Sequence, residues 1–469
     1  MKLDISRFYQ ATNPSKTLAI ENEEDRKFYI DFSSVRGGAI IQEIKRKIIN
    51  PFKEVPDESS CQLFTGHIGC GKSTELLRLK KELQDEKFHV VYFVSDEDLE
   101  FSDVDVGDVL LTIARHVDES LQAKKINLQP TGFKKLLQDV GKVLNADVLG
   151  ITLKPPKMAE VELGDIGYKT RGDEFSISFA IGEIIAQTKA SPTLREKLRG
   201  FLEPRTKQLI DAINNELLRP AIAKLKQAHH KGLVVIVDNL EKIDISPKPS
   251  GRFQPEYLFI DRGSQLRGLH CHIIYTIPLS LRFCNEFNVL SQRFMGELPW
   301  VLDMVAVQSR DRTEHSEGMA LLREMLIARA FPGLDLEQRR LEAQQPRQSP
   351  HIYTIVESVD DLDRLCLVSG GHIRVLLNLL NDWIGKDQRL PLTRPTLESL
   401  IKMRRNHSAL SITPDEWALL HHVTETQSVF GDGGYQSLIR GMYVYEYQDL
   451  EGFWFDIDPI LRGAKEFRA

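Results

Sequence analysis

Eight residues early in the chain, Gly66-His67-Ile68-Gly69-Cys70-Gly71-Lys72-Ser73, match the pattern G-x-x-x-x-G-K-[ST]. A mostly apolar run, Cys61–Thr65, precedes them, and a helix-forming run, Thr74–Leu83, follows. The glycines allow the backbone to curl so that its N–H groups face phosphate oxygens, and the helix N-terminus adds a partial positive charge. The pattern therefore predicts a strand, a phosphate-binding loop and a helix, with a nucleoside triphosphate as the ligand. A glycine-rich turn without a ligand is disfavoured, because strand and helix both stand where the loop requires them.

The last residues of this loop have specific expected roles. Lys72 would reach the β- and γ-phosphates, and Ser73 would hold Mg²⁺. The predicted nucleotide-binding residues are Gly66, His67, Ile68, Gly69, Cys70, Gly71, Lys72, Ser73 and Thr74.

A second candidate site residue follows another apolar run, Leu233–Val237, which ends at Asp238. A carboxylate at the end of such a strand would hold Mg²⁺ through water molecules, next to the phosphate loop. Many buried strands end in aspartate, so the pattern is weak alone and strong when paired with the loop. The predicted cofactors are therefore Mg²⁺, with Ser73 and Asp238 as the metal ligands, and a nucleoside triphosphate. ATP is the expected nucleotide, and these residues leave its preference over GTP open.

Composition narrows the class of protein. A chain of 469 residues is long enough for about two to four domains. Its five cysteines include no C-x-x-C pair, which favours reduced thiols over disulfides or a zinc site. No apolar stretch approaches the ~20 residues that span a bilayer, and residues 1–6 lack the apolar core of a signal peptide. We therefore expect a cytoplasmic protein with no membrane partner.

Apolar strands alternate with helical patterns through the first two thirds of the chain. Further strands are predicted over Phe88–Val94, Cys271–Ile277 and Trp300–Val307. This alternation indicates an α/β fold with a parallel sheet covered by helices on both faces. Together with the loop Gly66–Ser73, it predicts a P-loop NTPase parallel sheet. Residues 123–205 are less regular and are interpreted as an insertion, with a hairpin or loop around Lys154–Lys157. The predicted domains are an N-terminal segment (1–40), the NTPase core (41–310), a helical lid (311–405) and a small C-terminal α+β module (406–469).

The C-terminal module has its own pattern. Thr413-Pro414-Asp415-Glu416 combines a capping residue, a proline in the first turn and two acids, and so predicts a helix start. A second helix over Tyr435–Gly441 and two strands, Met442–Tyr447 and Phe453–Ile457, are predicted to follow. Helix, helix and β-hairpin is the order of a winged-helix module; a small α+β cap without a recognition role is the alternative.

Three short segments resemble the AAA+/STAND branch of P-loop ATPases, closest to initiator-like members with a C-terminal winged helix. Asp238-Asn239-Leu240-Glu241 is similar to the D-x-x-[DE] form of signal-transducing switch ATPases. The run His272–Thr276 ends in a hydroxyl residue where AAA+ proteins carry sensor 1. Ser369-Gly370-Gly371-His372-Ile373-Arg374 resembles sensor 2, whose arginine reaches the nucleotide from the lid.

The resemblance implies roles for these residues. Glu241 would position the attacking water, Thr276 would contact the γ-phosphate or that water, and Arg374 would couple phosphate loss to lid movement. A solvated turn residue, a plain strand end and a plain helix start are the respective alternatives. The expected catalytic residues are Lys72, Asp238, Glu241, Thr276 and Arg374. Because Asn239 stands where many fast ATPases carry glutamate, hydrolysis is expected to be slow or partner-stimulated.

Two functions stay open after this reading. One is an ATP-driven switch that controls a protein effector or regulator; the resemblance would place it in signalling, and in bacteria also in anti-phage defence. The other is a DNA-binding AAA+ loader or initiator. A small-molecule kinase is weakest, because it needs neither lid nor winged helix. The chain could also form a homo-oligomer.

Charge favours the protein partner over nucleic acid. The whole chain has a formal net charge of −6, and residues 391–469 contain eight Lys or Arg against eleven Asp or Glu. The predicted wing, Glu446–Asp458, has five acids and no base, whereas a wing that binds phosphates should be basic. Lys402, Arg404 and Arg405 form a small basic cluster that keeps DNA as the alternative.

Overall fold

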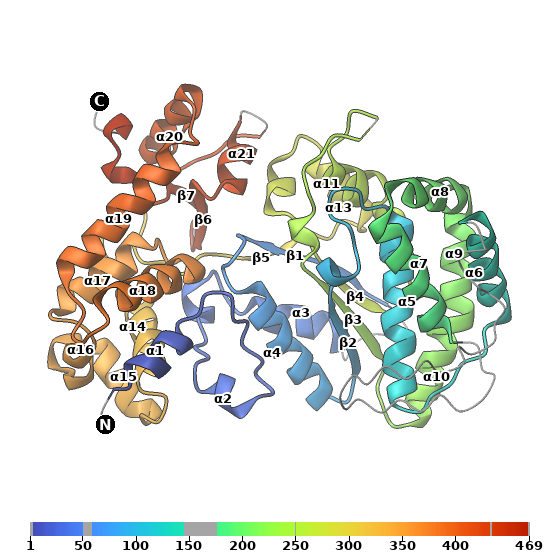
Figure 1. The fold of residues 1–469 in the computed structure, drawn as a ribbon, viewed down its shortest axis with the longest axis horizontal. Helices are drawn as coiled ribbons and strands as arrows, with labels where there is room; N and C mark the ends of the chain where they lie inside the picture. Colours follow the sequence, from blue (N-terminus) through green and yellow to red (C-terminus); the bar gives the residue numbers. More distant parts are fainter. Residues whose placement is uncertain (1–2, 50–58, 145–175, 249, 432–433, 468–469) are drawn as a thin grey trace.

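A parallel β-sheet forms the centre of the protein (Figure 1). The computed structural model describes residues 3–49, 59–144, 176–248, 250–431 and 434–467. The sheet has five strands in the order β2-β3-β4-β1-β5, all parallel. Its strands are β1 (Cys61–Gly66), β2 (His89–Val94), β3 (Leu233–Asp238), β4 (His272–Thr276) and β5 (Trp300–Leu302). β4 therefore lies between the strand that leads into the phosphate loop and the strand that ends at Asp238.

All five predicted strands are confirmed, but β5 is shorter than predicted. It was expected to continue to Val307 and ends at Leu302. The backbone beyond Leu302 leaves the sheet because its N–H groups bond elsewhere: Met304 donates to the Glu446 carbonyl and Ala306 to the Val35 carbonyl. This segment therefore connects the sheet to two distant parts of the chain.

Alternating strand residues form two apolar layers, as expected for a sheet covered on both faces. Val235 and Ile273 face one layer, and Val234 and Ile274 face the other. The second layer is covered by α3 (Ile40–Ile49) and α4 (Lys72–Asp85). The remaining helices of this part are α5 (Val106–Ala123), α6 (Thr131–Val143), α7 (Ile177–Ala190), α8 (Pro192–Leu202), α9 (Thr206–Ala212), α10 (Arg219–Gln227), α11 (Gln254–Glu256), α12 (Gly263–Leu266) and α13 (Phe287–Arg293).

The described parts of the predicted irregular insertion are mainly helical. Its described parts form α6, α7 and α8, which pack into the same apolar layer as α5 (Figure 1). Buried apolar residues recur at helical spacing in α6: Phe133, Leu136, Leu137 and Val140. This helical period is present in the sequence, so the interpretation of the segment as irregular is wrong here. The hairpin or loop expected around Lys154–Lys157 lies outside the described residues.

The predicted helical lid, residues 311–405, is mostly helical and has its own core; its role as a lid stays a prediction. It comprises α14 (Ser316–Ala330), α15 (Leu336–Gln344), α16 (Pro350–Ile355), α17 (Val359–Val368), α18 (Ile373–Asp387) and α19 (Arg394–Ala409). The N-terminal segment, with α1 (Ile5–Ala11) and α2 (Glu23–Arg26), buries Phe8, Ile30 and Phe32 in this same core. The described part of residues 1–40 therefore packs as a part of the lid.

The C-terminal module has the predicted order of elements. It contains α20 (Pro414–Thr426), α21 (Tyr435–Arg440) and an antiparallel hairpin of β6 (Val444–Asp449) and β7 (Gly452–Ile457). Thr413 and Glu416 form a capping box at the start of α20. Tyr445, Tyr447 and Trp454 of the hairpin enter the apolar layer that α4 covers. The helix–helix–hairpin order is confirmed, and its assignment as a winged helix stays a prediction.

None of the helices in the described ranges is long and apolar enough to cross a membrane.

Candidate nucleotide-binding site

The predicted phosphate loop connects β1 to α4, as the pattern requires. Gly66, Gly69 and Gly71 have φ angles of 151°, 90° and 112°, a region that favours glycine. A Cβ atom at Gly66 would lie 2.5 Å from the Leu302 carbonyl oxygen, and one at Gly69 would lie 2.8 Å from Cε1 of His372. These two glycines are therefore needed for the approach of β5 and of the lid.

Lys72 is 3% exposed, and its ammonium group is fully engaged. It donates to the Gly66 and His67 carbonyls at 3.0 Å each, and lies 3.0 Å from Oε1 of Glu241. Burial lowers the pKa of Lys72, but the charge of Glu241 outweighs it and the pKa is raised. Burial likewise disfavours the Glu241 carboxylate, yet Lys72 brings its pKa below the ordinary value. Both groups are thus charged, and the three N–H donors of Lys72 all have partners.

Asp238 lies at the end of β3, next to Ser73. Tyr92 donates its hydroxyl to Oδ2 of Asp238 at 2.7 Å, and the Asn239 N–H donates to Oδ1 at 2.8 Å. Burial and the charge of Glu241 raise the pKa of Asp238, while hydrogen bonds from Ser73 and Tyr92 oppose the rise. The structure therefore brings the two predicted metal ligands into contact, and adds Tyr92, which no sequence motif marks.

This pair fits Mg²⁺, which takes one or two carboxylates and completes its shell with phosphate oxygens and water. Ser73 and Asp238 would supply one hydroxyl and one carboxylate. Within the described ranges, no group of three or more His, Cys, Asp or Glu residues suits a metal ion, so a protein-only cage is not offered there.

Thr276 holds the turn that carries Glu241. It is fully buried, its Oγ1 accepts the Leu240 N–H at 3.0 Å, and its hydrogen bond helps to lower the pKa of Glu241. Asn239 has a positive φ of 69° and donates from Nδ2 to the Asp96 carboxylate at 3.0 Å. Thr276 therefore lies beside Glu241 and supports its position, whereas the side-chain amide of Asn239 points to Asp96.

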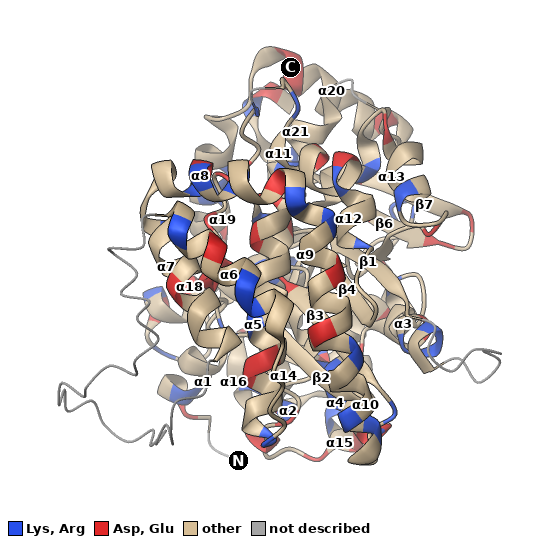
Figure 2. Cartoon of the chain, turned by 90° about the vertical axis from the view of Figure 1, so that its right-hand side faces the viewer, with Lys and Arg blue, Asp and Glu red and all other residues tan. Residues whose placement is uncertain are grey.

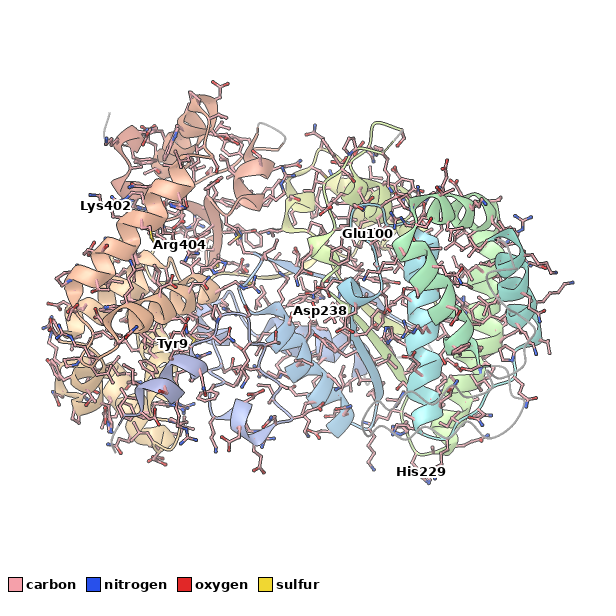
Figure 3. All side chains as sticks on the ribbon, viewed as in Figure 1. Tyr9, Glu100, His229, Asp238, Lys402 and Arg404 are labelled. Atoms are coloured by element: carbon pink, nitrogen blue, oxygen red, sulfur yellow. The ribbon has the colours of Figure 1, made fainter. Side chains whose placement is uncertain are left out.

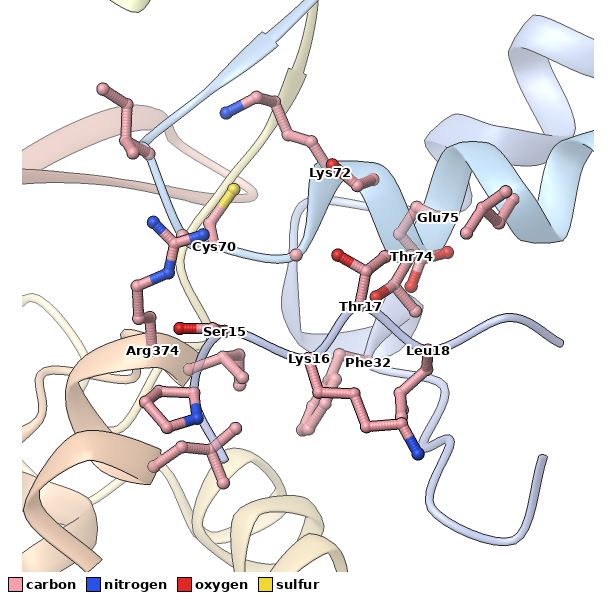
Figure 4. A pocket seen from close by; sticks show the side chains of 18 of the residues that line it. Ser15, Lys16, Thr17, Leu18, Phe32, Cys70, Lys72, Thr74, Glu75 and Arg374 are labelled. Atoms are coloured by element: carbon pink, nitrogen blue, oxygen red, sulfur yellow. The ribbon is translucent and has the colours of Figure 1, made fainter. Parts of the chain in front are cut away.

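A cavity of about 420 Å³ opens beside the phosphate loop (Figure 4). Its polar lining includes Lys72, Ser73 and Glu241, and the lid contributes Arg374. In Figure 4, Arg374 lies beside Cys70 on one side, and residues 15–18 of the N-terminal segment run along another. The size and the mixed lining suit a nucleotide.

The N-terminal lining was missed by the sequence reasoning. Leu18, Phe28, Ile30 and Phe32 contribute apolar surface to the cavity, and Arg36 donates from Nη2 to the Cys70 carbonyl at 2.8 Å. No motif marks these residues. The alternation of Phe28, Ile30 and Phe32 was the one visible sign that this segment is buried.

The turn before α18 bonds directly to the phosphate loop. His372 accepts the Val375 N–H at Nδ1, so its Nε2 carries the proton and donates to the Ile68 carbonyl at 2.9 Å. Burial lowers the pKa of His372 to about 3 and keeps the ring neutral. The Arg374 N–H donates to the Gly69 carbonyl at 3.3 Å. The predicted sensor 2 segment and the loop are therefore in contact.

Strand β6 contacts both the loop and this lid turn. The Glu446 N–H donates to Nε2 of His67 at 2.9 Å, and the Tyr447 hydroxyl donates to the Gly370 carbonyl at 2.8 Å. The Tyr445 ring lies between, with its centre 5.7 Å from that of His67 and 5.8 Å from that of His372. The His67 side chain thus contacts β6, so that only the backbone of His67 would be available to a phosphate.

The parallel sheet, the loop at the end of β1 and the acid at the end of β3 together fit a P-loop fold. No family model matches this chain, and no curated protein matches it. Among solved structures, the chain is similar to the ORC2 protein of Aeropyrum pernix, determined in ADPNP–ADP complexes, with 12% identity over 91% of each chain and a TM-score of 0.40. What the site can do therefore follows from its own geometry.

Proposed function

We propose that this protein is a cytoplasmic ATP-binding switch of the AAA+/STAND type, which hydrolyses ATP slowly and controls a partner protein. The observation that carries the proposal is the ion pair between Lys72 and Glu241. A triphosphate that binds Lys72 competes with Glu241 for the same ammonium group. Binding would then free the carboxylate, which Thr276 keeps close to the site, to orient a water molecule.

A switch also needs a route from the site to a surface. β6 supports this role, because it bonds to His67 in the loop and to Gly370 in the lid turn. A change at either contact would alter how the C-terminal module is held. A partner that recognises the released module would be controlled by the nucleotide; in bacteria, signalling and anti-phage defence are the settings in which we propose such a switch. A homo-oligomer is compatible with this scheme.

The acids of the predicted wing turn mostly toward the chain itself. Glu446 pairs with Arg282, Asp449 with Arg310 and Asp456 with Arg462, while Asp458 is 8% exposed. The expected acidic surface is therefore largely neutralised within the protein, which weakens the original electrostatic objection to DNA. Strand β6 nevertheless disfavours DNA binding, because it already contacts the phosphate loop and the lid and is not available to a duplex.

On the face that Figure 2 presents, the described basic residues are not gathered into one patch. Figure 2 shows basic and acidic residues interspersed over helices α5 to α9. Lys402 and Arg404 lie on α19, well away from Asp238 (Figure 3). Arg405 donates to the Gly463 carbonyl at 2.7 Å. These observations favour a protein partner over the alternative, a DNA-binding loader or initiator.

We expect slow turnover by the purified protein, on the order of 10⁻² per second or below, as in other nucleotide switches without their partners. Glu241→Gln should reduce turnover by about 100-fold, because general-base catalysis contributes at least that much. The same variant should bind ATP more tightly, because the competitor for Lys72 has lost its charge. Phosphate release and calorimetric titration measure the two effects.

Glu75→Gln is the matched control, because Glu75 lines the same cavity but bonds to Tyr29. It should leave turnover within about twofold of the wild type. Rapid turnover without a partner, insensitive to Glu241→Gln, would contradict both the switch and the role of Glu241.

We further expect weak binding of duplex DNA at physiological salt. The few basic residues on α19 cannot supply the many phosphate contacts that drive affinity. Strand β6 is also unavailable, because it contacts the phosphate loop and the lid. Fluorescence anisotropy with a labelled duplex at several salt concentrations, with and without ATP, is the measurement. Submicromolar affinity at physiological salt that is lost in a Lys402→Ala, Arg404→Ala variant would instead favour the DNA-binding alternative.

A further inference from the structure

Arg329, on α14, is a buried cation that lines the cavity. Arg329 is only 6% exposed. Nη1 donates to the Met325 carbonyl at 3.3 Å and to the Phe28 carbonyl at 3.5 Å, and Nε has no hydrogen-bond partner among the described residues. Burial lowers the pKa of Arg329 to about 10, with no carboxylate contributing to its environment. Buried charges in proteins are normally paired, since an isolated one is costly.

Two other buried arginines of the lid show the usual arrangement. Arg323, six residues earlier on α14, is 6% exposed and donates from Nε to Oδ1 of Asp363 at 2.6 Å. Arg339 is 7% exposed and donates to Glu324 at 3.2 Å. Arg329 makes no such ion pair with any described residue. Its charge is therefore not explained by the folding of the lid.

The surroundings of Arg329 indicate which part of a ligand it would meet. Its two carbonyl partners belong to Phe28 and Met325, which line the apolar part of the cavity with Leu377. In the proposed function, Lys72, Ser73 and the loop N–H groups would bind the phosphates. The base and ribose of a nucleotide present ring nitrogens and oxygens that accept hydrogen bonds, and a guanidinium group is a donor only.

We propose that Arg329 contacts the base–ribose end of the bound nucleotide and so ties the lid to the ligand from α14. This rests on the proposed nucleotide-binding function and adds a residue that no motif in the sequence marked. The nucleotide would supply hydrogen-bond acceptors for the Arg329 guanidinium that the described residues do not provide. Arg329 would therefore act in ligand binding and contribute little to folding.

The test compares Arg329→Met with Arg323→Met by calorimetric titration and thermal unfolding. The probes are a non-hydrolysable ATP analogue and inorganic tripolyphosphate, which lacks base and ribose. Arg329→Met should weaken binding of the ATP analogue at least tenfold, leave tripolyphosphate binding unchanged, and not lower the Tm of the ligand-free protein. Arg323→Met should lower the Tm, because Asp363 loses its partner, and leave affinity for the analogue within twofold.

Arg329→Lys provides a second variant that keeps the charge but loses the planar donor group, and several-fold weaker analogue binding is expected. Unchanged analogue affinity in a folded Arg329 variant overturns the inference while the proposed function stands. Parallel loss of tripolyphosphate binding also overturns it, because the contact would then be to phosphate. A wild-type protein that binds neither probe overturns the proposed function as well.

Discussion

Replacing Lys72 with alanine is expected to reduce affinity for a non-hydrolysable ATP analogue by about 100-fold or more. In the proposed function the ammonium group is the side-chain cation that would bind the β- and γ-phosphates, and such hydrogen bonds would be charge-assisted. A loss of ~2.7 kcal/mol lies within the range for such bonds. Calorimetric titration in the presence of Mg²⁺ measures it.

The same change should also affect folding, because it leaves Glu241 without its cation. Removing one partner of a buried ion pair costs about 3–5 kcal/mol. The double variant Lys72→Ala, Glu241→Gln should regain most of this stability, measured by chemical unfolding, without regaining affinity. Unchanged affinity in a folded Lys72→Ala protein would contradict the assignment of the loop.

A second large effect is expected where the C-terminal hairpin is held. Glu446 is 1% exposed and pairs with Arg282. Arg282→Ala would leave this carboxylate buried without a cation, at a cost of about 3–5 kcal/mol, which raises the detached population of β6 by at least about 100-fold. In the wild type the Glu446 N–H is bonded to His67, so its hydrogen exchange should become faster in the variant and would report the detachment directly. Phosphate release should rise with it if β6 restrains the loop.

The effect of Arg282→Ala should depend on pH. Burial raises the pKa of Glu446 above its ordinary value, so the docked state favours the protonated acid. Docking in the variant should therefore strengthen as the pH falls through that raised pKa, and weaken as the pH rises. The double variant Arg282→Ala, Glu446→Gln should show neither the fast exchange nor the pH dependence. Slow exchange in the single variant at high pH would show that this pair does not hold the hairpin.

The central sheet could be predicted from the sequence because its strands are short, mostly apolar runs separated by polar and helix-forming segments. The loop, Asp238 and the helix–helix–hairpin order of the C-terminal module also follow from local patterns. The ion pair of Lys72 with Glu241 could not be predicted, because it depends on β4 lying between β1 and β3. Spacing along the chain contains no information about that strand order.

Other features depend on contacts between segments that are far apart in the sequence. Arg36 reaches the loop from a segment that carries no motif, and Tyr92 reaches Asp238 from the neighbouring strand. The acids of the hairpin were read as surface charges because their partners, such as Arg282 and Arg310, lie more than a hundred residues away. Burial of a charge is decided by tertiary packing, which a charge count along the chain does not report.

The position of Glu241 against Lys72 has a consequence for how the protein would sense its ligand. The carboxylate would act as an internal substitute for a phosphate and neutralise Lys72 until a nucleotide binds. A nucleotide would have to displace this substitute, so its apparent affinity would be lower than its contacts alone would give, in proportion to the fraction of molecules in which Lys72 is free. The strength of one ion pair would then set the ATP concentration at which the site fills. Return of Glu241 to Lys72 would also help to expel the products after hydrolysis.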